Sequence, residues 1–554
     1  MPTVVLNKEV FEKLVGKKLP LDILKDRISM LGTDLEKIEG NEIHVEVFPN
    51  RPDMLSEQGF ARALSSFIGV KTGLKEYKIK KSGYKVLIDS SVTMRPYTMC
   101  AIVKNLTFTD EKIREIMQIQ EKLATTHGRN RKKSAYGIYP ADKINFPIKY
   151  TAKNPEEVLF KPLGFTKQIK ASQVAEEHPK GIAYKHLTEG WKEYPFFIDA
   201  KLQIMCMLPF TNSEETGKIE LNTKDVFIEC TGVDLENVTI ALNIIVTMLA
   251  DMGGEVYSMD MVYSNKTITS PELSPKKMKL KLEYVNKRLG LNLKEGDVKK
   301  LLERMGYDYD KGIVSIPAYR ADILHMIDIV EDIAIAYGYE NFSEEIPNVS
   351  TIAQEDEFKI FERRISNILC GLGLIETCNY HLINYDEQTK KMNLNEKAMD
   401  SVNVKLANPT TAEYNALRSW MIPCLMNVFK SNKHNEYPQK IFDTGIVFRK
   451  NKNTETNVEE ITTLAVGSSH ATTDFTEIKQ ILDYLLNMLN IEYKIIEHEH
   501  PSFITGRIGE IIIRDKKMGV IGEISPQVLE NFGLETPVSA FELDLNELFN
   551  VMRH

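Results

Sequence analysis

One short segment of this sequence places a carboxylate and a hydroxyl where they can act together. Residues 225–232 alternate in the manner of a β-strand, so Phe227, Glu229 and Thr231 are expected to share one face. Glu229 and Thr231 would then both point toward whatever that face lines. The same pair is typical of a half-buried strand whose polar face is simply solvated, so the spacing alone leaves both interpretations open.

A second group of residues could bind phosphates. Four cations, Arg129, Arg131, Lys132 and Lys133, fall within five positions of a loop that precedes an expected strand at 134–139. Positive charges at this density can neutralise the backbone of a nucleic acid. A run of charge is more often a solvated surface, so the run alone does not decide between the two.

A third group is acidic. Asp322 precedes an expected helix on which Asp328, Glu331 and Asp332 lie at i, i+3 and i+4 and therefore share one face. Closely packed carboxylates repel, and a hard cation such as Mg²⁺ with oxygen ligands is one remedy. The alternative is an exposed acidic helix start, which the helix dipole favours, and the spacing alone favours this alternative.

The elements that must position these groups are those of a mixed α+β chain. Residues 43–48 alternate as a strand and stop at a turn containing Pro49 and Pro52, after which 55–67 has helical spacing of apolar residues. Further along, a helix is expected from Asp234 to Gly253, with acids in its first turn and glycines at its end. The expected elements do not follow the repeating βαβ order of a nucleotide-binding sheet.

The chain has 554 residues, which predicts three or four domains at roughly 150 residues each. A lysine-rich stretch at 75–81 is interpreted as a linker or an exposed edge, and no solenoid repeat or low-complexity tract is visible. The expected regions are an N-terminal α+β domain at 1–80, a second domain at 84–264, a third at 266–345 and a fourth at 350–554.

Composition excludes several classes of protein. Hydrophobic residues make up 43% and charged residues 27%, which is ordinary for folded protein, and the net charge of −8 neither indicates nor excludes a nucleic-acid binder. The six cysteines are scattered without CxxC spacing, which favours reduced thiols over a zinc ribbon or a disulfide framework. No secretory signal is visible, and the apolar stretch 238–252 is too short and polar to span a bilayer. We therefore expect a cytoplasmic protein with no membrane association.

Several motifs together resemble one family. The third region carries Pro317-Ala318-Tyr319-Arg320-Ala321-Asp322-Ile323, then residues 328–332 and Tyr337-Gly338-Tyr339, and it resembles the tRNA-side domain of phenylalanyl-tRNA synthetase β subunits. Residues 178–181, 194–195 and 227–232 resemble the editing domain of the same family. Residues 407–409, 417–418, 441–445 and 541–544 resemble its synthetase-type core. The chain has no oligonucleotide-barrel insertion after its first region and no room for an anticodon-binding domain after Asp544, so we expect the archaeal/eukaryotic type.

The resemblance implies a C-terminal antiparallel core like that of class II aminoacyl-tRNA synthetases, but without the catalytic motifs. A class II active site holds phosphates with arginines on its motif 2 strand and motif 3 helix, because guanidinium pairs with phosphate oxygens in a bidentate manner. Here the motif 2 region, 417–420, lacks the usual Arg-x-Glu, and the motif 3 region, 519–526, has glycines but no arginine. Those glycines are better interpreted as turn and packing residues. We expect amino-acid activation in a sister α subunit.

The resemblance also implies an editing pocket for the aminoacyl end of tRNA, lined by Phe197, Cys206, Glu229 and Thr231. A carboxylate there could recognise the phenol of tyrosine, which phenylalanine lacks. Cys206 departs from the small hydroxyl residue of the family and is a weaker hydrogen-bond partner. The family's His-Asp in the strand after the basic loop is Tyr139-Pro140 here, so no acid–base role is expected at that place. The basic loop, beside the pocket, is expected to contact RNA.

The partners and cofactors follow from the same resemblance. We expect a two-plus-two heterotetramer with the α subunit, binding of tRNA(Phe), and use of ATP by the complex. Mg²⁺ shared with the α subunit is expected at Asp322, Asp328, Glu331 and Asp332. Two alternatives remain open: a free-standing trans-editing deacylase, and a scaffold subunit whose editing site is inactive.

Overall fold

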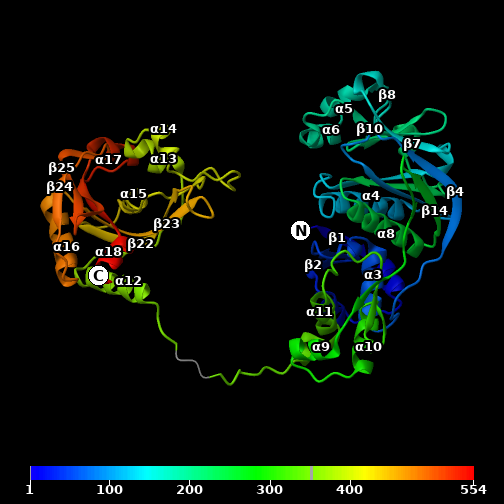
Figure 1. The fold of residues 1–554 in the computed structure, drawn as a ribbon, viewed down its shortest axis with the longest axis horizontal. Helices are drawn as coiled ribbons and strands as arrows, with labels where there is room; N and C mark the ends of the chain where they lie inside the picture. Colours follow the sequence, from blue (N-terminus) through cyan, green and yellow to red (C-terminus); the bar gives the residue numbers. More distant parts are fainter. Residues whose placement is uncertain (1, 350–352, 554) are drawn as a thin grey trace. The chain divides into compact units, whose positions relative to one another are not determined.

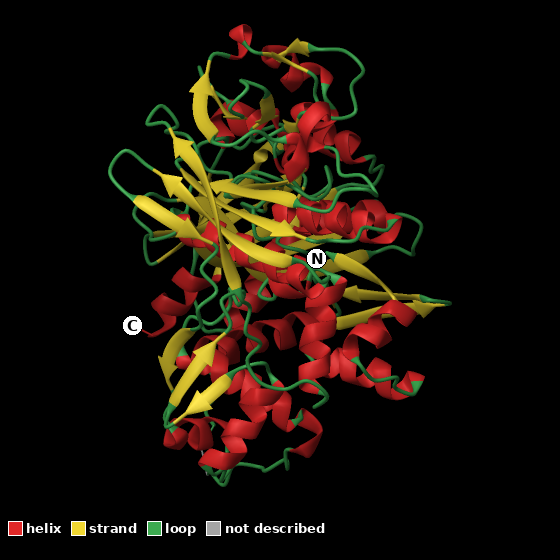
Figure 2. Ribbon diagram, turned by 90° about the vertical axis from the view of Figure 1, so that its right-hand side faces the viewer, coloured by secondary structure: helices red, strands yellow, loops and turns green. Residues whose placement is uncertain are grey.

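A computed structural model describes residues 2–349 and 353–553. The chain divides into two compact units, Met1–Ile346 and Pro347–His554, which are described separately (Figure 1). Helices and strands are interspersed throughout both units (Figure 2), as expected for a mixed chain of several domains. Within the described ranges, no helix is long and apolar enough to cross a membrane.

The N-terminal part of the first unit is a small sheet with helices. Its antiparallel strands have the order β1-β3-β2. The predicted strand and helix at 43–67 are confirmed as β3 and α3, and Ser56 caps α3 by accepting the Gly59 N–H at 3.1 Å. Gly59 is required because a β-carbon there would lie 1.9 Å from the Asp53 carbonyl oxygen. The elements are β1 (Thr3–Asn7), α1 (Lys8–Val15), α2 (Leu21–Met30), β2 (Asp34–Glu39), β3 (Glu42–Glu46), η1 (Pro52–Met54) and α3 (Glu57–Phe67).

A ten-stranded sheet forms the centre of the first unit. Its order is β12-β11-β10-β7-β4-β14-β5-β13-β6, with β15 paired to β14. Neighbours are antiparallel except that β4 runs parallel to both β7 and β14. The strands are β4 (Ile79–Ile88), β5 (Tyr97–Lys104), β6 (Ser134–Pro140), β7 (Ile148–Lys153), β10 (Tyr194–Ile198), β11 (Ile204–Met207), β12 (Thr211–Asn212), β13 (Val226–Gly232), β14 (Glu255–Val262) and β15 (Thr267–Ser270).

This sheet extends beyond the boundaries expected for the second domain. Strand β4 begins at Ile79, inside the stretch expected as a linker, and β15 ends at Ser270. Two long helices, α4 (Asp110–Thr125) and α8 (Leu235–Asp251), lie beside the sheet (Figure 1). Most of α8 is buried, which confirms the prediction of a core helix from the apolar stretch near 238–252. A smaller layer holds β8 (Leu159–Phe160), β9 (Ile169–Lys170), α5 (Ala171–Glu177), α6 (Pro179–Tyr184) and α7 (Glu214–Gly217).

The third region packs onto the N-terminal part, so the first three expected regions form one unit. Glu303, in α10, accepts hydrogen bonds through its carbonyl oxygen from Ser66 Oγ at 2.9 Å and from the Gly73 N–H at 2.7 Å. Arg304 Nε donates to the carbonyl oxygen of Phe67 at 2.9 Å. The elements are β16 (Lys276–Lys279), α9 (Leu282–Leu289), α10 (Glu295–Arg304), β17 (Asp308–Asp310), β18 (Ile313–Ile316) and α11 (Met326–Tyr337).

The second unit is built on a seven-stranded sheet of order β19-β22-β23-β27-β26-β25-β24. All neighbours are antiparallel except β19 and β22. Alternate residues face two different cores: Leu464 and Phe541 pack with α12, α16 and α18, while Ala465 and Ala540 pack with α15 and α17. The elements are α12 (Glu357–Gly371), β19 (Ile375–Glu376), α15 (Ile422–Asn432), β22 (Gln439–Lys450), β23 (Val458–Ser469), α16 (Phe475–Met488), β24 (Lys494–Glu497), β25 (Phe503–Ile513), β26 (Lys516–Ile524), α17 (Pro526–Phe532), β27 (Val538–Asp544) and α18 (Leu545–Arg553).

Candidate functional site

Glu229 lies in the middle of β13, between β5 and β6, and is 1% exposed. On β6, Gly137 is its register partner, and Tyr139 lies on the same face two residues further along. The Tyr139 hydroxyl oxygen lies 3.2 Å from Glu229 Oε1 and 3.0 Å from Asn212 Oδ1. Gly137 makes this arrangement possible, because a β-carbon there would lie 2.5 Å from both Glu229 Oε1 and the Tyr139 hydroxyl oxygen.

The surroundings of Glu229 change its protonation. Burial raises the pKa of its carboxyl to about 8, and the hydrogen bond from Tyr139 and the charges of Arg95 and Arg131 only partly offset this. The group is therefore mostly protonated at pH 7 and ionises as the pH rises through about 8. Its Oε1 faces Tyr139, whereas Oε2 has no hydrogen-bond partner within the described part of the chain. A buried and unpaired polar atom is costly unless a ligand or water satisfies it.

Glu229 forms part of the wall of a cavity of about 670 Å³. This volume lies in the range of pockets for small ligands. Most of the lining is apolar and comes from α4, β6 and the segment 208–219, and a few polar groups interrupt it. The residues with polar side chains in the lining are Gln120, Glu121, Arg131, Tyr136, His178, Lys180, Thr211, Asn212, Glu214, Lys218 and Glu229.

The polar groups at the cavity are largely held by one another. Arg131 Nη1 donates to the carbonyl oxygens of Pro209 and Phe210 at 2.9 and 2.8 Å. Glu121 accepts from Arg131 Nη2 at 3.3 Å and from Lys180 Nζ at 2.7 Å, so the two cations and one carboxylate form a connected group. These charge-assisted hydrogen bonds hold the side chains of the cavity wall in place. Together, Arg131, Lys180 and Glu121 carry a net positive charge.

The other three residues predicted for the pocket lie behind this wall. Phe197 and Cys206 face each other across β10 and β11, and both are fully buried. Thr231 is also buried, and its Oγ1 lies 3.5 Å from the Ala135 carbonyl oxygen. None of the three contributes to the cavity lining, whereas Glu229 does. Burial raises the pKa of Cys206 far above its ordinary value, so it stays a thiol.

Two residues beside Glu229 were not anticipated. Local sequence patterns indicate no role for Tyr139 or Asn212. In the structure, the Tyr139 hydroxyl lies within hydrogen-bond distance of both the Glu229 carboxyl and the Asn212 side-chain oxygen. The missing signal was the register between β6 and β13, which places Tyr139 on the face of Glu229. Such a register depends on long-range strand pairing and cannot be determined from local alternation.

The basic loop separates into two kinds of residue. Arg129 and Lys132 are exposed, whereas Lys133 pairs with Asp234 at 3.2 Å. Arg131 is a structural residue of the cavity wall, and its guanidinium lies 4.7 Å from the centre of the Tyr184 ring. Arg129, Asn130 and Arg131 all have positive φ angles, from 48° to 62°, so the loop is tightly folded. Arg129 and Lys132 are therefore the two cations of this loop that remain exposed.

Two of the predicted metal ligands pair instead with a buried arginine. Asp322 accepts two hydrogen bonds from Arg320, at 2.8 and 2.7 Å. Asp332 lies 2.8 Å from Arg320 Nη2 and also accepts the Tyr307 hydroxyl. Arg320 therefore occupies both carboxylates with charge-assisted hydrogen bonds, and its single positive charge balances one of the two negative charges.

The other two acids lie at different places on α11. Asp328 accepts the N–H groups of Leu324 and His325, at 2.8 and 2.7 Å, and so caps the helix. Glu331 is exposed and accepts the Tyr339 hydroxyl at 2.6 Å. Within residues 2–349 and 353–553, no group of three or more His, Cys, Asp or Glu side chains is placed to hold a metal ion. Within the described residues, the four acids are therefore not brought together into one cluster.

In the second unit, Arg418 has a structural role. It is 1% exposed, its Nε donates to the Ile446 carbonyl oxygen at 2.7 Å, and its Nη1 donates to the Asn379 carbonyl oxygen at 3.2 Å. A β-carbon at Gly519 would lie 1.8 Å from the Glu542 carbonyl oxygen, which confirms that this glycine serves packing. Neither the 417–420 segment nor the 519–526 segment presents a guanidinium for a nucleotide phosphate.

The comparisons with known proteins agree with the motifs. Residues 278–339 match the family model of the tRNA synthetase B5 domain, and residues 343–545 match that of the phenylalanyl tRNA synthetase beta chain CLM domain. These matches define the chain as a subunit of the aminoacyl-tRNA synthetase class, a component of protein biosynthesis.

Whole-chain relatives identify the family. The phenylalanine–tRNA ligase beta subunit of Pyrococcus abyssi is 39% identical over 99% of this chain and 100% of its own length. That of Methanocella arvoryzae is 40% identical over 99% and 100%. A crystal structure of an N-terminal fragment of the beta subunit from Pyrococcus horikoshii covers 61% of this chain and 99% of the fragment, with 37% identity and a TM-score of 0.59. The chain belongs to the family of phenylalanine–tRNA ligase β subunits, which confirms the resemblance.

Proposed function

We propose that this chain assembles with a catalytic α subunit into a two-plus-two heterotetramer that attaches phenylalanine to tRNA(Phe) with ATP in the cytoplasm. Membership of the β-subunit family supports the partnership. The antiparallel sheet of the second unit is the synthetase-like half of the core, and Arg418 is committed to packing within it. Activation of phenylalanine therefore takes place on the α subunit.

Within this complex, the chain hydrolyses mischarged Tyr-tRNA(Phe). The observation that carries this proposal is the unpaired Oε2 of Glu229 in the wall of a largely apolar cavity. The apolar lining accepts an aromatic ring, and the single buried carboxyl accepts the phenol that distinguishes tyrosine from phenylalanine. A site built to hydrogen-bond one hydroxyl separates such substrates far better than a hydrophobic pocket does.

The surrounding residues position this contact and do not attack the ester. Tyr139 and Asn212 hold the carboxyl in place, while Arg131 and Lys180 supply positive charge that attracts the 3′ end of tRNA. Cys206 is a buried thiol and Thr231 is a buried hydroxyl, and neither lines the cavity, so neither can reach the ester. Water is therefore the nucleophile, and the substrate's own position determines the rate.

Arg129 and Lys132 contact the tRNA backbone next to the cavity. Both are exposed cations on a tightly folded loop, which is the arrangement that binds phosphates without ordering a flexible segment.

The test of editing is hydrolysis of preformed esters by the purified complex. We expect Tyr-tRNA(Phe) to be deacylated faster than Phe-tRNA(Phe), and both rates to fall when Arg129 and Lys132 are replaced by alanine. If the complex deacylates neither ester above the enzyme-free rate, the chain is a scaffold with an inactive site. If the isolated chain deacylates as fast as the complex, it is a trans-editing deacylase.

The protonation of Glu229 leads to a pH prediction. The phenol O–H bonds more strongly to an ionised carboxylate than to a neutral carboxyl. Because burial raises the Glu229 pKa to about 8, the deacylation advantage of wild type over Glu229→Gln should increase as the pH rises from 7 to 9. The measurement is the ratio of the two enzymatic rates, each corrected for spontaneous hydrolysis. A ratio that stays flat over this range would contradict an ionising contact at Glu229.

We propose that Asp328 and Glu331 bind magnesium at the junction with the α subunit. Asp322 and Asp332 are not available for this because they pair with Arg320. The double variant Asp328→Ala with Glu331→Ala is expected to weaken assembly with the α subunit or its magnesium dependence. Folding should change little, since losing the helix cap costs about 1 kcal/mol. Sedimentation with and without magnesium, and thermal unfolding, measure the two effects. Normal assembly with unchanged magnesium dependence would show that this helix face is only solvated.

A further inference from the structure

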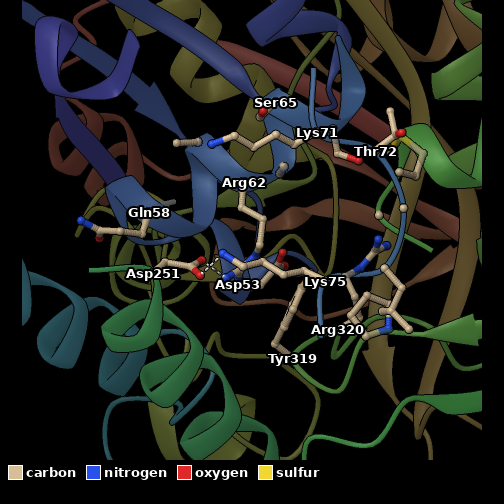
Figure 3. A pocket seen from close by; sticks show the side chains of 18 of the residues that line it. Asp53, Gln58, Arg62, Ser65, Lys71, Thr72, Lys75, Asp251, Tyr319 and Arg320 are labelled. Carbon is tan, nitrogen blue, oxygen red and sulfur yellow. Dashed lines mark hydrogen bonds and ion pairs between the residues drawn. The ribbon is translucent and has the colours of Figure 1, made fainter. Parts of the chain in front are cut away.

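A second cavity, of about 360 Å³, lies in the first unit and has a different wall from that of Glu229. Helix α3, the loop at 71–75, the end of α8 and the segment 317–320 surround it, so residues from all three expected N-terminal regions meet there. Figure 3 shows Arg62, Asp53 and Asp251 close together, with Arg320 to one side and Lys71 above them.

Cations outnumber carboxylates in this lining. The basic residues of the lining are Arg51, Arg62, Lys71, Lys75 and Arg320, and the acidic ones are Asp53 and Asp251. Asp322 and Asp332 pair with Arg320 from outside the lining, so the group as a whole has one positive charge in excess. An excess of buried or partly buried cations repels unless an anion neutralises it. The cavity therefore favours an anionic occupant.

The two carboxylates are already paired. Asp53 accepts from Arg51 Nε and Nη2 at 2.9 and 2.8 Å. Asp251 accepts from Arg62 Nη1 and lies 2.6 Å from Lys75 Nζ. Arg320 is paired with Asp322 and Asp332, so Lys71 is the one basic residue of this lining without a carboxylate partner among the described residues.

Arg320 carries the unsatisfied donor. Its side chain is 2% exposed, and its Nε and Nη2 are used by Asp322 and Asp332. Its Nη1 has no partner among the described residues, although two N–H groups on it can donate. A buried guanidinium nitrogen without an acceptor at the wall of a cavity is the feature that a bound oxyanion would satisfy.

Lys71 completes the arrangement at the rim. It is exposed, and its Nζ makes only a long contact of 3.4 Å with the Leu14 carbonyl oxygen. The free N–H groups of Arg320 inside and the Lys71 ammonium at the entrance can donate to separate oxygens of one phosphate, which offers more acceptor oxygens than a carboxylate does. A nucleic-acid strand does not fit, because Arg320 is enclosed.

We propose that this cavity is a binding site for a small phosphate-bearing molecule, held by Arg320 Nη1 and closed by Lys71. The site is independent of the editing cavity and of the proposed hydrolysis. It lies where α3, α8 and the third region meet, so its occupant would tie the three regions of the first unit together.

The probe is inorganic phosphate, titrated calorimetrically into the purified complex, with acetate as the singly charged comparison. We expect saturable phosphate binding, weaker binding of acetate, and at least about tenfold weaker phosphate binding in Lys71→Glu. Lys78→Glu is the matched control, because Lys78 is exposed on the same connecting segment but does not line the cavity, and it should bind as wild type does.

Arg320→Lys removes the free guanidinium nitrogen and should abolish binding, but it also disturbs two ion pairs, so Lys71→Glu is the decisive variant. Absence of saturable phosphate binding by wild type would overturn the proposal, as would equal binding by Lys71→Glu and Lys78→Glu. Equal affinity for acetate and phosphate would overturn the choice of a phosphate-bearing ligand. Deacylation and charging rates should be the same in Lys71→Glu as in wild type, which separates this site from the editing site.

Discussion

Glu229→Ala in the assembled complex is expected to slow hydrolysis of preformed Tyr-tRNA(Phe) about tenfold to a hundredfold at a pH above the Glu229 pKa of about 8. A hydrogen bond to a charged group contributes about 1.5–3 kcal/mol, and about 1.4 kcal/mol corresponds to a factor of ten in rate. Synthesis of Phe-tRNA(Phe) should remain nearly intact, because no part of this cavity takes part in activation. The two rates are measured in parallel on wild-type and variant complexes.

The chain offers a matched control for this variant. Glu214 lines the same cavity, but its Oε2 is occupied by the Gly164 N–H at 2.8 Å. Glu214→Ala should therefore leave the ratio of Tyr-tRNA to Phe-tRNA hydrolysis unchanged. Equal deacylation by wild type and Glu229→Ala would remove Glu229 from the site.

The isolated chain is expected to show no phenylalanine-dependent exchange between ATP and pyrophosphate. Exchange requires cationic groups on the α- and γ-phosphates, and bidentate guanidinium contacts are how class II enzymes provide them. Arg418 donates to backbone carbonyl oxygens in the interior, and residues 519–526 contain no arginine. Radiolabelled pyrophosphate exchange measures this, and addition of the α subunit is the positive control. Robust exchange by a preparation proven free of α subunit would contradict the assignment of activation to that partner.

Local patterns predicted the elements well. Alternation at 43–48 and 226–232 and helical spacing at 55–67 depend on only a few neighbouring residues, and the structure has strands and a helix at these places. The buried helix α8 was recognisable because nearly all of its turns are apolar.

Local patterns could not predict contacts between distant segments. The boundary near residue 80 was placed in a lysine-rich stretch, but β4 pairs there with β14. The contact between Arg62 and Asp251 joins two regions expected to be separate. A run of charged residues predicts an exposed segment. An ion pair between distant segments, such as Arg62 with Asp251, can be found only from the packed structure.

The acidic face of α11 shows the same limit. Spacing correctly placed Asp328, Glu331 and Asp332 on one helix. It could not reveal that Arg320 pairs with Asp322 and Asp332. At the cavity beside Glu229, alternation grouped Glu229 with Thr231, yet only Glu229 reaches the cavity lining. The burial of each side chain depends on the neighbouring strands, so it cannot be predicted from the sequence of one strand alone.

We infer that this chain is the non-activating subunit of a two-chain ligase. The most direct measurement is charging of tRNA(Phe) with phenylalanine by each chain alone and by the chains co-expressed and purified together. We predict that only the co-purified complex forms Phe-tRNA(Phe). Charging by this chain alone, or full charging by the α subunit without it, would contradict the claim.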